Sequence, residues 1–547
     1  MEIRALLAIV LSMIILVGFQ YFSGNLSTPP ARQIKQAEKQ KPDQSNSNQK
    51  AVIKSSSSEK PMQVQQPTAS AQPSRVARDI AVETDLYRMV LSEEGATLKQ
   101  CLLKRYAIGM EPGSPPVNLV NASPPDLPLG IKLGPSPGLD LSTQLFEADS
   151  GSLTLDNAHK EGKLNFLYRL PNGLEVLKTY TFHEGSYWID LSIRLKGFKE
   201  GSATISLYDR PLEAETRYIF SGPSYFAKGG LNAVKLTKPG ETSDYSGKVD
   251  WLGYGDNYFL AAMVPIKPED SDHVIIERKD KEGLTVSSLT MPVKSVESGG
   301  SIDLGLYFGP KEIGTLKGFD HNLANSIDFG WFTLISKPLL YFLNFLYRYI
   351  HNYGLAIIII TMLIKIAFWP LAYKSAKSMK TMQKLQPKLA KLKEKYGDDK
   401  ERLNKELMQL YKTFKVNPMS GCLPMILQIP VFFALYKVLL QAIELRHAPF
   451  ALWIKDLSAP DRLMIPGVTI PFIGGIPVLT LLMGASMYMQ QKMTPSSLDP
   501  TQAKMMQILP VVFTFMFINF PSGLVLYWLV NNIFSIIQQY YINKFTD

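Results

Sequence analysis

The chain has 547 residues, 46% of them hydrophobic, and a formal net charge of +10. Its two cysteines, Cys101 and Cys422, lie far apart, and the second falls in an apolar segment, so a disulfide framework is not expected. The six histidines show no metal-ligand spacing, and the sequence has neither a phosphate-binding loop nor a nucleophile elbow. We therefore expect no enzyme, no metal, no cofactor and no small-molecule substrate.

The chain opens with an apolar segment and continues with a polar one. Residues 1–23 contain an apolar run that is longer than the hydrophobic part of a signal peptide and is followed by no A-x-A cleavage site. We interpret them as a transmembrane anchor with its N-terminus in the cytoplasm; a signal peptide is the alternative. Residues 24–80 are rich in Ser, Gln, Lys and Pro, which is typical of a flexible linker, here periplasmic.

Residues 81–320 alternate apolar and polar side chains with a period of two. The segment Tyr187–Leu195 shows the alternation clearly, and Gly, Pro, Asn and Asp separate such segments. The pattern predicts a large antiparallel β-sandwich domain of many strands. We interpret the histidines of this region as surface or strand residues rather than as a catalytic set: His159, His183 and His273.

The rest of the chain is apolar enough for a membrane. Residues 321–352 predict an amphipathic helix in the interface, because a span there would place the lysine-rich stretch after residue 373 outside, against the positive-inside rule. Residues 353–541 predict five transmembrane helices, which with the anchor make six, and residues 542–547 form a short cytoplasmic tail. The predicted fold class is a polytopic α-helical membrane protein with a periplasmic β-sandwich, and its core spans are 353–373, 420–441, 473–490, 506–520 and 523–541.

Lys365 is a lone charge inside one of these apolar spans. A charge near the middle of a membrane helix costs about 2.5–3.5 kcal/mol on insertion scales, so it normally faces water or a partner. Lys365 is therefore a candidate functional residue, although it could also snorkel to the headgroups. The polar residues of all five spans fall mainly in the predicted cytoplasmic half, and those we assign to a site are Thr361, Gln428, Gln507, Asn531 and Ser535.

This one-sided polarity predicts a hydrated groove in the inner leaflet below an apolar outer seal. A transporter would place polar groups across the whole thickness or at the midplane, so a transporter with Lys365 as an anion site is the less favoured alternative. A cell-envelope scaffold without translocation activity is a second alternative. Hydrogen bonding between helices is another interpretation of the same Asn and Gln residues.

Residues 374–415 carry 13 Lys and Arg against five Asp and Glu, a net charge of +8. Apolar residues recur there at three- and four-residue steps, which predicts a cytoplasmic basic helical hairpin over residues 374–418. Asp398 and Glu401 have the spacing of a capping box. The charge could serve only to retain the hairpin in the cytoplasm, or it could contact anionic lipid or ribosomal RNA.

Three strings give the chain a family resemblance: VNPMSGCLP at 416–424, PFALWIKDL at 449–457 and FPSGLVLY at 520–527. Together with the anchor, linker, sandwich and helical core, they resemble the YidC family of membrane protein insertases in its Gram-negative form, over nearly the whole length. The resemblance implies an insertase and chaperone that needs no energy source. It also implies a multi-pass inner-membrane protein with both termini cytoplasmic, acting alone or with the Sec translocon.

The resemblance also implies roles for particular residues. Family members hold a positive charge in an inner-leaflet groove, and Lys365 occupies that position, where the family usually has arginine. Positions that the family uses for substrate contact match Thr361, Tyr527 and Trp528. The resemblance also implies a hydrophobic slide along the spans 420–441 and 506–520, the third and fifth when the anchor is counted as the first. It would consist of Ile429, Phe432, Phe433 and Met516.

The implied partners are nascent membrane proteins, the Sec translocon, the ribosome and anionic lipid. The sequence ends at Asp547 without a long basic tail, so we expect ribosome contact on the hairpin and on the loop at 491–505. The hairpin residues assigned to this contact are Lys384, Lys388, Lys391, Asp398 and Asp399.

Overall fold

The computed structural model describes residues 75–134, 138–198, 200–210, 220–293, 300–396, 399–414, 423–467, 474–493 and 500–545. The described chain is built of strands up to residue 310 and of helices from residue 313. The predicted anchor, nearly all of the predicted linker and Cys422 lie outside the described residues.

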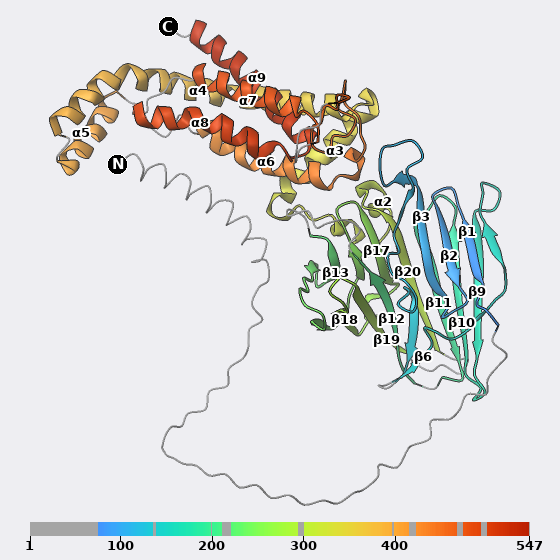
Figure 1. Ribbon diagram of the computed structural model, residues 1–547. Helices are drawn as coiled ribbons and strands as arrows, with labels where there is room; N and C mark the ends of the chain where they lie inside the picture. Colours follow the sequence, from blue (N-terminus) through green and yellow to red (C-terminus); the bar gives the residue numbers. More distant parts are fainter. Residues whose placement is uncertain are drawn as a thin grey trace, which may run out of the picture. The chain divides into compact units, whose positions relative to one another are not determined.

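The strands form three sheets, drawn from blue to green in Figure 1. The five-stranded sheet has the order β4(Pro116–Asn118), β3(Thr97–Ala107), β2(Tyr87–Ser92), β1(Asp79–Glu83), β8(Ser152–Thr154). The nine-stranded sheet has the order β14(Gly230–Ala233), β13(Gly222–Ala227), β16(Trp251–Gly255), β17(Phe259–Pro265), β20(Gly300–Pro310), β11(Trp188–Lys196), β10(Glu175–His183), β9(Glu161–Arg169), β7(Glu147–Ala148). The six-stranded sheet has the order β15(Thr242–Ser246), β18(His273–Arg278), β19(Thr285–Val293), β12(Gly201–Asp209), β5(Gly130–Leu133), β6(Leu139–Asp140).

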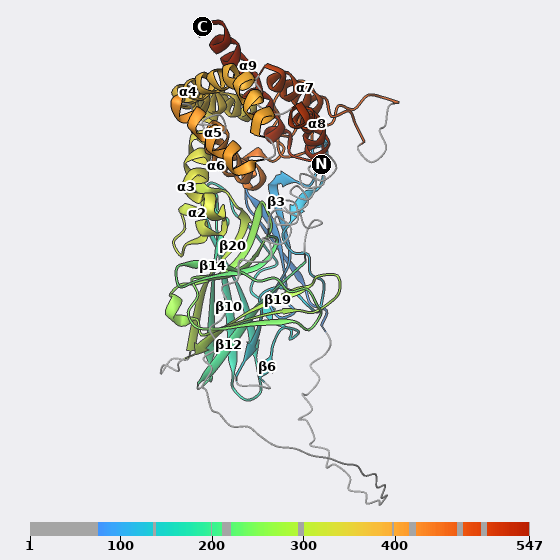
Figure 2. The same cartoon turned by 90° about the vertical axis from the view of Figure 1, so that its left-hand side faces the viewer.

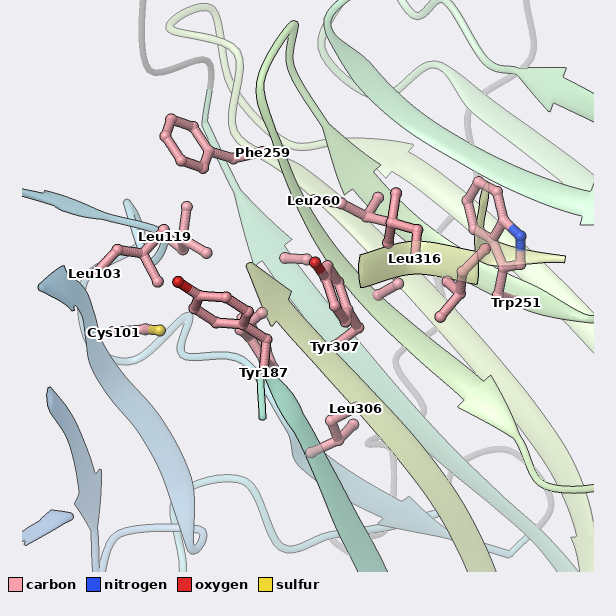
Figure 3. Close-up of a cluster of buried hydrophobic side chains, with 14 of the residues drawn as sticks. Cys101, Leu103, Leu119, Tyr187, Trp251, Phe259, Leu260, Leu306, Tyr307 and Leu316 are labelled. Atoms are coloured by element: carbon pink, nitrogen blue, oxygen red, sulfur yellow. The ribbon is translucent and has the colours of Figure 1, made fainter. Parts of the chain in front are cut away.

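The period of two in the sequence becomes the two faces of each sheet. Along β10 every second residue is buried, and β10 pairs antiparallel with β11 so that Val176 faces Leu195 and Tyr180 faces Leu191. Alternation of this kind places one side-chain set in the core and the other toward solvent. Figure 3 shows part of that core, where Tyr187, Tyr307 and Trp251 point into the interior among leucines. The predicted β-sandwich is confirmed.

The described cysteine of this domain is buried, and the histidines of its strands and loops are paired with aspartates. Cys101 is a buried free thiol of the same core, and burial raises its pKa. The three histidines of the domain each contact an aspartate, as His183 does with Asp190 across β10 and β11 at 2.7 Å. No group of three or more His, Cys, Asp or Glu that could hold a metal is found in the described part of the chain.

A short irregular segment leads from the sandwich to the helices. It contains α2(Ile313–Lys317) and two 3-10 turns, η2(Leu323–Ser326) and η3(Gly330–Phe332). The amphipathic helix α3(Thr333–Ile350) follows, so the helix predicted within 321–352 begins only at Thr333. Its exposed face is aromatic, while Ser336 on the buried face donates to the carbonyl of Ala434 at 3.0 Å. Its position at a membrane interface stays a prediction.

The helical core consists of α4(Tyr353–Tyr396), α6(Leu423–Gln441), α7(Val478–Met493), α8(Pro500–Phe517) and α9(Ser522–Phe545). Helices α7 and α8 lie side by side (Figures 1 and 2). Of the described helices, α4 is the one long and apolar enough by itself to cross a membrane; the apolar helical stretches Ile426–Gln441 and Gln507–Phe517 are shorter. The number of six spans therefore stays a prediction.

The predicted basic hairpin is formed by the second half of α4 and by α5(Lys400–Thr413). At 1.5 Å per residue, the unbroken α4 is about 66 Å long, more than twice the thickness of a bilayer core. Met382 and Leu385 are buried against Leu389 and Tyr411 in a cluster separate from the main core. The capping assignment was wrong: Asp399 caps α5 by accepting the Arg402 backbone N–H at 3.0 Å, and Asp398 lies outside the described residues.

One loop contacts all five helices of the core at the same end. We call residues 442–467 the outer loop and this end the loop end; the opposite end, where α4 continues into the hairpin, is the hairpin end. The outer loop continues directly from α6 and holds the start of α4 through Asn352, whose amide donates to the Phe450 carbonyl at 2.9 Å. It also holds the start of α9, since Ser522 N–H donates to the Ala459 carbonyl at 2.7 Å. Its contacts with α7 and α8 are described below.

Candidate functional site

A connected group of polar side chains surrounds Lys365 between three helices. The Lys365 ammonium of α4 donates to Ser535 Oγ of α9 at 2.8 Å, although the two residues are 170 positions apart in the chain. It lies 3.5 Å from Gln428 Oε1 of α6, at the outer limit of a hydrogen bond. The lysine chosen from the sequence therefore has polar partners on two other helices.

Gln428 extends this network toward the loop end. Its amide nitrogen donates to Tyr527 Oη at 3.2 Å and to Asn531 Oδ1, both on α9. Ser535 in turn donates to the Asn531 carbonyl at 2.8 Å. We call these five residues the polar cluster: Lys365, Gln428, Tyr527, Asn531 and Ser535.

The polar cluster contains a cation and no anion. Within the described residues, no carboxylate lies within ion-pair distance of Lys365, and its partners are a hydroxyl and an amide oxygen. Neutral dipoles can stabilise an ammonium without cancelling its charge. The cluster therefore presents a net positive charge between α4, α6 and α9.

Lys365 and Ser535, at one side of the polar cluster, lie well away from the loop end. At 1.5 Å per residue, Lys365 is about 18 Å along α4 from its start, and Ser535 is about 20 Å along α9 from its start. Between Lys365 and the loop end lie the fully buried apolar side chains of Ile357, Leu439 and Leu524, together with the buried polar Thr361 and Gln441. The one-sided polarity expected from the sequence stays a prediction, because buried polar residues such as Thr480 and Ser522 also lie at the loop end.

Three other predicted groove residues lie outside this network. The Thr361 hydroxyl is buried and donates to the Ile357 carbonyl of its own helix at 2.7 Å. Trp528 packs between Phe432 of α6 and Phe517 of α8, with ring centroids 4.8 and 4.9 Å away. Gln507 is exposed on α8 and has no hydrogen bond to the polar cluster.

Another polar residue of α9 joins two helices and has no hydrogen bond to the polar cluster. Asn532 is buried, and its amide donates to Ser486 Oγ of α7 at 3.0 Å, while its neighbour Asn531 belongs to the polar cluster. Successive residues on a helix point about 100° apart, so the two asparagines serve different neighbours. Hydrogen bonding between helices therefore accounts for Asn532, while a groove lined by polar residues stays a prediction.

The residues predicted to form a hydrophobic slide fall into two groups. Phe432 and Phe433 are half-buried in the aromatic cluster around Trp528, whereas Ile429 and Met516 are about two-fifths exposed. The exposed surface of α8 is wider than predicted, because Phe515 is 72% exposed beside Met516. Its other exposed apolar residues are Ile508, Val511 and Val512.

The predicted contact residues of the hairpin are mostly exposed. Lys384, Lys388 and Lys391 lie at its surface, and the Lys388 ammonium is 4.4 Å from the centroid of the Phe414 ring. Asp399 has a structural role as the cap of α5. The sequence reasoning missed Asp461 and Arg462 of the outer loop, since nothing in a local pattern shows that a loop residue caps a helix far along the chain.

Two family models match this chain and together cover most of it. The one described as "60Kd inner membrane protein" matches residues 345–547, and "YidC periplasmic domain" matches residues 79–342. Two relatives are each called "Membrane protein insertase YidC". The relative from Syntrophobacter fumaroxidans is 42% identical over 561 residues, and the one from Pelobacter propionicus is 44% identical over 567; each alignment covers 100% of both chains.

A solved structure entitled "Active YidC insertase crystal structure with the first transmembrane domain resolved" is 19% identical to this chain. It covers 86% of this chain and 93% of its own at a TM-score of 0.37, which is too loose a superposition to support a conclusion. The β-sandwich, the helical core and the family matches define an inner-membrane protein with a periplasmic-type domain. Within that class, the chain belongs to the YidC family of membrane protein insertases.

Proposed function

We propose that this chain inserts nascent membrane proteins through a hydrated groove whose wall is the polar cluster. The groove opens toward the hairpin end, which we assign to the cytoplasm because the hairpin carries the net charge of +8. The loop end is then periplasmic. The observation that carries the proposal is the Lys365 ammonium, held by neutral side chains inside an apolar helix and without a carboxylate partner among the described residues.

The uncompensated charge explains how a client would enter. Two opposite unit charges 4 Å apart attract by about 1 kcal/mol in bulk water and by about 4 kcal/mol at an effective dielectric constant of 20. An acidic segment of a nascent chain therefore gains more from Lys365 inside the protein than it would from a lysine in solution. Gln428 and Ser535 hold the ammonium in place with no negative charge that would compete with the client.

The short helices explain how the energy barrier to moving a polar client segment across the membrane is lowered. Helix α7 has 16 residues and α8 has 18, or about 24 and 27 Å, whereas a bilayer core is about 30 Å thick. A polar segment that reaches Lys365 from the cytoplasm has about 18 Å of α4 left to pass before the loop end. The polar segment therefore crosses a shorter apolar region than it would have to cross in the bilayer itself.

The apolar part of the client would leave along α6 and α8. Ile429 on α6, and Phe515 and Met516 on α8, present exposed apolar side chains next to the aromatic cluster of Trp528. Burial of apolar surface yields about 25 cal/mol per Å², so a client helix of about 20 apolar residues gains enough by entering lipid to complete the transfer without a nucleotide.

The partners we propose follow from the two ends of the core. The exposed lysines of the hairpin suit the ribosome and anionic headgroups at the cytoplasmic face. The apolar surface of α8 suits a client helix, with or without the Sec translocon beside it. Both termini are cytoplasmic in this topology.

The test is insertion in purified liposomes by wild type, Lys365→Arg, Lys365→Gln and Lys365→Ala. The client is a single-span protein with an acidic N-terminal tail, scored by protection from protease, and a neutral-tail version is the matched control. We expect Lys365→Arg to insert both clients. Lys365→Gln and Lys365→Ala should lose most of their insertion activity toward the acidic-tail client and keep it toward the neutral-tail client. Equal protection by all four variants would remove Lys365 from the mechanism. No protection above empty liposomes, beside an active control insertase, would refute the insertase assignment.

A further inference from the structure

Two adjacent residues of opposite charge hold the loop end of α7 and α8. Asp461 of the outer loop is 2% exposed, and its carboxylate accepts the backbone N–H groups of Leu479 and Thr480 at 2.5 and 3.2 Å. These are the second and third residues of α7, and the residue before α7 is Pro477, whose side chain cannot accept a hydrogen bond. Asp461 therefore caps a helix that begins 17 residues later, where the helix dipole favours a negative charge.

The cap requires a carboxylate, because both oxygens accept. Oδ2 takes the two helix N–H groups, while Oδ1 accepts the indole N–H of Trp453 at 2.6 Å. An asparagine has one acceptor and one donor at these positions. In either orientation its NH₂ group would meet an N–H donor, at the indole or at the helix.

Arg462 holds the C-terminal end of the neighbouring helix α8, whereas Asp461 holds the N-terminal end of α7. Its guanidinium donates to the carbonyl of Ile518, immediately after α8, at 2.8 Å and to Asn519 Oδ1 at 2.9 Å. A third bond, to the Asp461 carbonyl at 2.7 Å, ties it to the cap of α7. A cation at the C-terminus of a helix is stabilised by the same dipole that stabilises an anion at the N-terminus. The charges of Asp461 and Arg462 thus match the opposite dipole ends that the antiparallel helices α7 and α8 present at the loop end.

The same segment also closes the start of α9. Leu457 and Ala459 accept the N–H groups of Gly523 and Ser522, and Leu463 pairs in both directions with Ile476 just before α7. A β-carbon on Gly523 would lie 3.5 Å from Ile357 and 3.4 Å from Leu439, so α4, α6 and α9 meet directly below the outer loop.

We propose that Asp461 and Arg462 form a clip that keeps the loop end of the core closed to water and ions, and so makes the groove one-sided. They are positioning residues, since neither lies in the polar cluster. The inference rests on the proposed function, in which the groove opens only at the hairpin end. Without the clip, the starts of α7 and α9 separate from the end of α8, and water reaches the apolar layer around Ile357.

The test is thiol labelling of a reporter cysteine at Ile357, which is fully buried next to Gly523. The full chain, with Cys101 and Cys422 replaced by Ser, is expressed in spheroplasts and treated from outside with a membrane-impermeant maleimide. A lost cap and an unmatched buried donor make local opening about tenfold more frequent, so we expect Asp461→Asn to raise the labelling rate about tenfold. Arg462→Gln should raise it as well, and both variants should leak ions from proteoliposomes.

The double variant Asp461→Asn/Trp453→Phe separates the clip from a general loss of stability. Phenylalanine removes the indole donor, so the asparagine can turn its oxygen to the α7 N–H groups, and labelling should return toward the wild-type rate. Unchanged labelling in Asp461→Asn and Arg462→Gln would overturn the clip, as would fast labelling that Trp453→Phe fails to reduce. If Asp461→Asn does not accumulate, Arg462→Gln decides alone. Absence of insertion by wild type would refute the proposed function but leave the labelling comparison valid.

Discussion

Gly484 of α7 and Thr514 of α8 lie so close that a β-carbon built on the glycine would stand 2.0 Å from the threonine Oγ1. The Thr514 hydroxyl is fixed there, since it donates to the Pro510 carbonyl of its own helix at 2.7 Å. Small residues permit such close approach of membrane helices, where van der Waals packing drives association. This contact fixes the spacing of α7 and α8.

Gly484→Ala should therefore destabilise the core by about 1–3 kcal/mol, the usual cost of overpacking. The measurement is the unfolding temperature of the purified chain in detergent. Gly484→Ala/Thr514→Ala should recover most of the loss, because the nearest remaining threonine atom would be Cβ at 3.2 Å. Thr514→Ala alone is the control and should change little; an equally large loss in the double variant would contradict the contact.

Changing the charge beside Lys365 should matter more than removing polarity there. Gln428→Glu would place a carboxylate next to the ammonium, about 3.5 Å away, and neutralise the cluster. We expect it to impair insertion of an acidic-tail client as much as Lys365→Ala does, and to leave a neutral-tail client unaffected. The isosteric wild-type glutamine is the reference.

Tyr527→Phe is the matched control for Gln428→Glu, since it removes one hydrogen bond to Gln428 and leaves the charge unchanged. It should reduce insertion by less than threefold, as expected for the loss of about 0.5 kcal/mol of hydrogen bonding. If Gln428→Glu inserted the acidic tail normally, the charge of the cluster would not be what attracts the client.

Removal of residues 377–412 should abolish insertion and leave the rest of the protein folded. The hairpin has its own small cluster around Met382 and Leu385, separate from the main core, so its loss uncovers little of that core. Insertion by the proteoliposome assay and the unfolding temperature measure the two effects. Normal insertion by the shortened chain would refute a role of the hairpin in client delivery.

The charge of the hairpin can be tested without deletion. Replacing Lys384, Lys388 and Lys391 by Gln keeps the helix and removes three exposed positive charges. Ribosome co-sedimentation should weaken and its salt dependence become shallower, as counterion release requires. Unchanged co-sedimentation at every salt concentration would exclude these lysines from the contact.

Lys178 makes the stability of the sandwich depend on pH. Its ammonium is fully buried and donates to the carbonyls of Gly95, Ala96 and Leu129 at 3.1, 2.8 and 2.7 Å. Burial lowers the pKa of Lys178 from 10.5 to about 7. Between that value and about 10.4, the pKa of lysine in an unfolded chain, the unfolded state binds more protons. The free energy of unfolding contributed by Lys178 should therefore rise as the pH increases from about 7 to 10.

Hydrogen exchange of the β10 amides in the full chain, corrected for intrinsic rates, measures this dependence. Protection should increase with pH in wild type and should stay flat in Lys178→Met, which fills a similar volume without a titratable group. If protection changed with pH in the same way in wild type and in Lys178→Met, Lys178 would not titrate in this range.

The main divisions of the chain could be predicted from local periodicity in the sequence. Alternation with a period of two identified the sandwich, and the basic hairpin followed from apolar residues at three- and four-residue steps. Lys365 stood out for an equally local reason: a charge in an apolar helix is costly wherever the helix packs. The family strings at 416–424, 449–457 and 520–527 needed no structure either.

Which side chains meet could be seen only in the packed structure. Lys365 contacts Ser535 and Gln428, which are 170 and 63 positions away, and no pattern within a window of residues fixes that pairing. Thr361 looked similar in the sequence, yet its hydroxyl bonds its own helix. Asp461 caps α7 from another segment, because a buried carboxylate is stabilised by whichever N–H groups the fold brings to it. Long-range hydrogen bonds depend on how helices pack, and packing is a property of the whole chain.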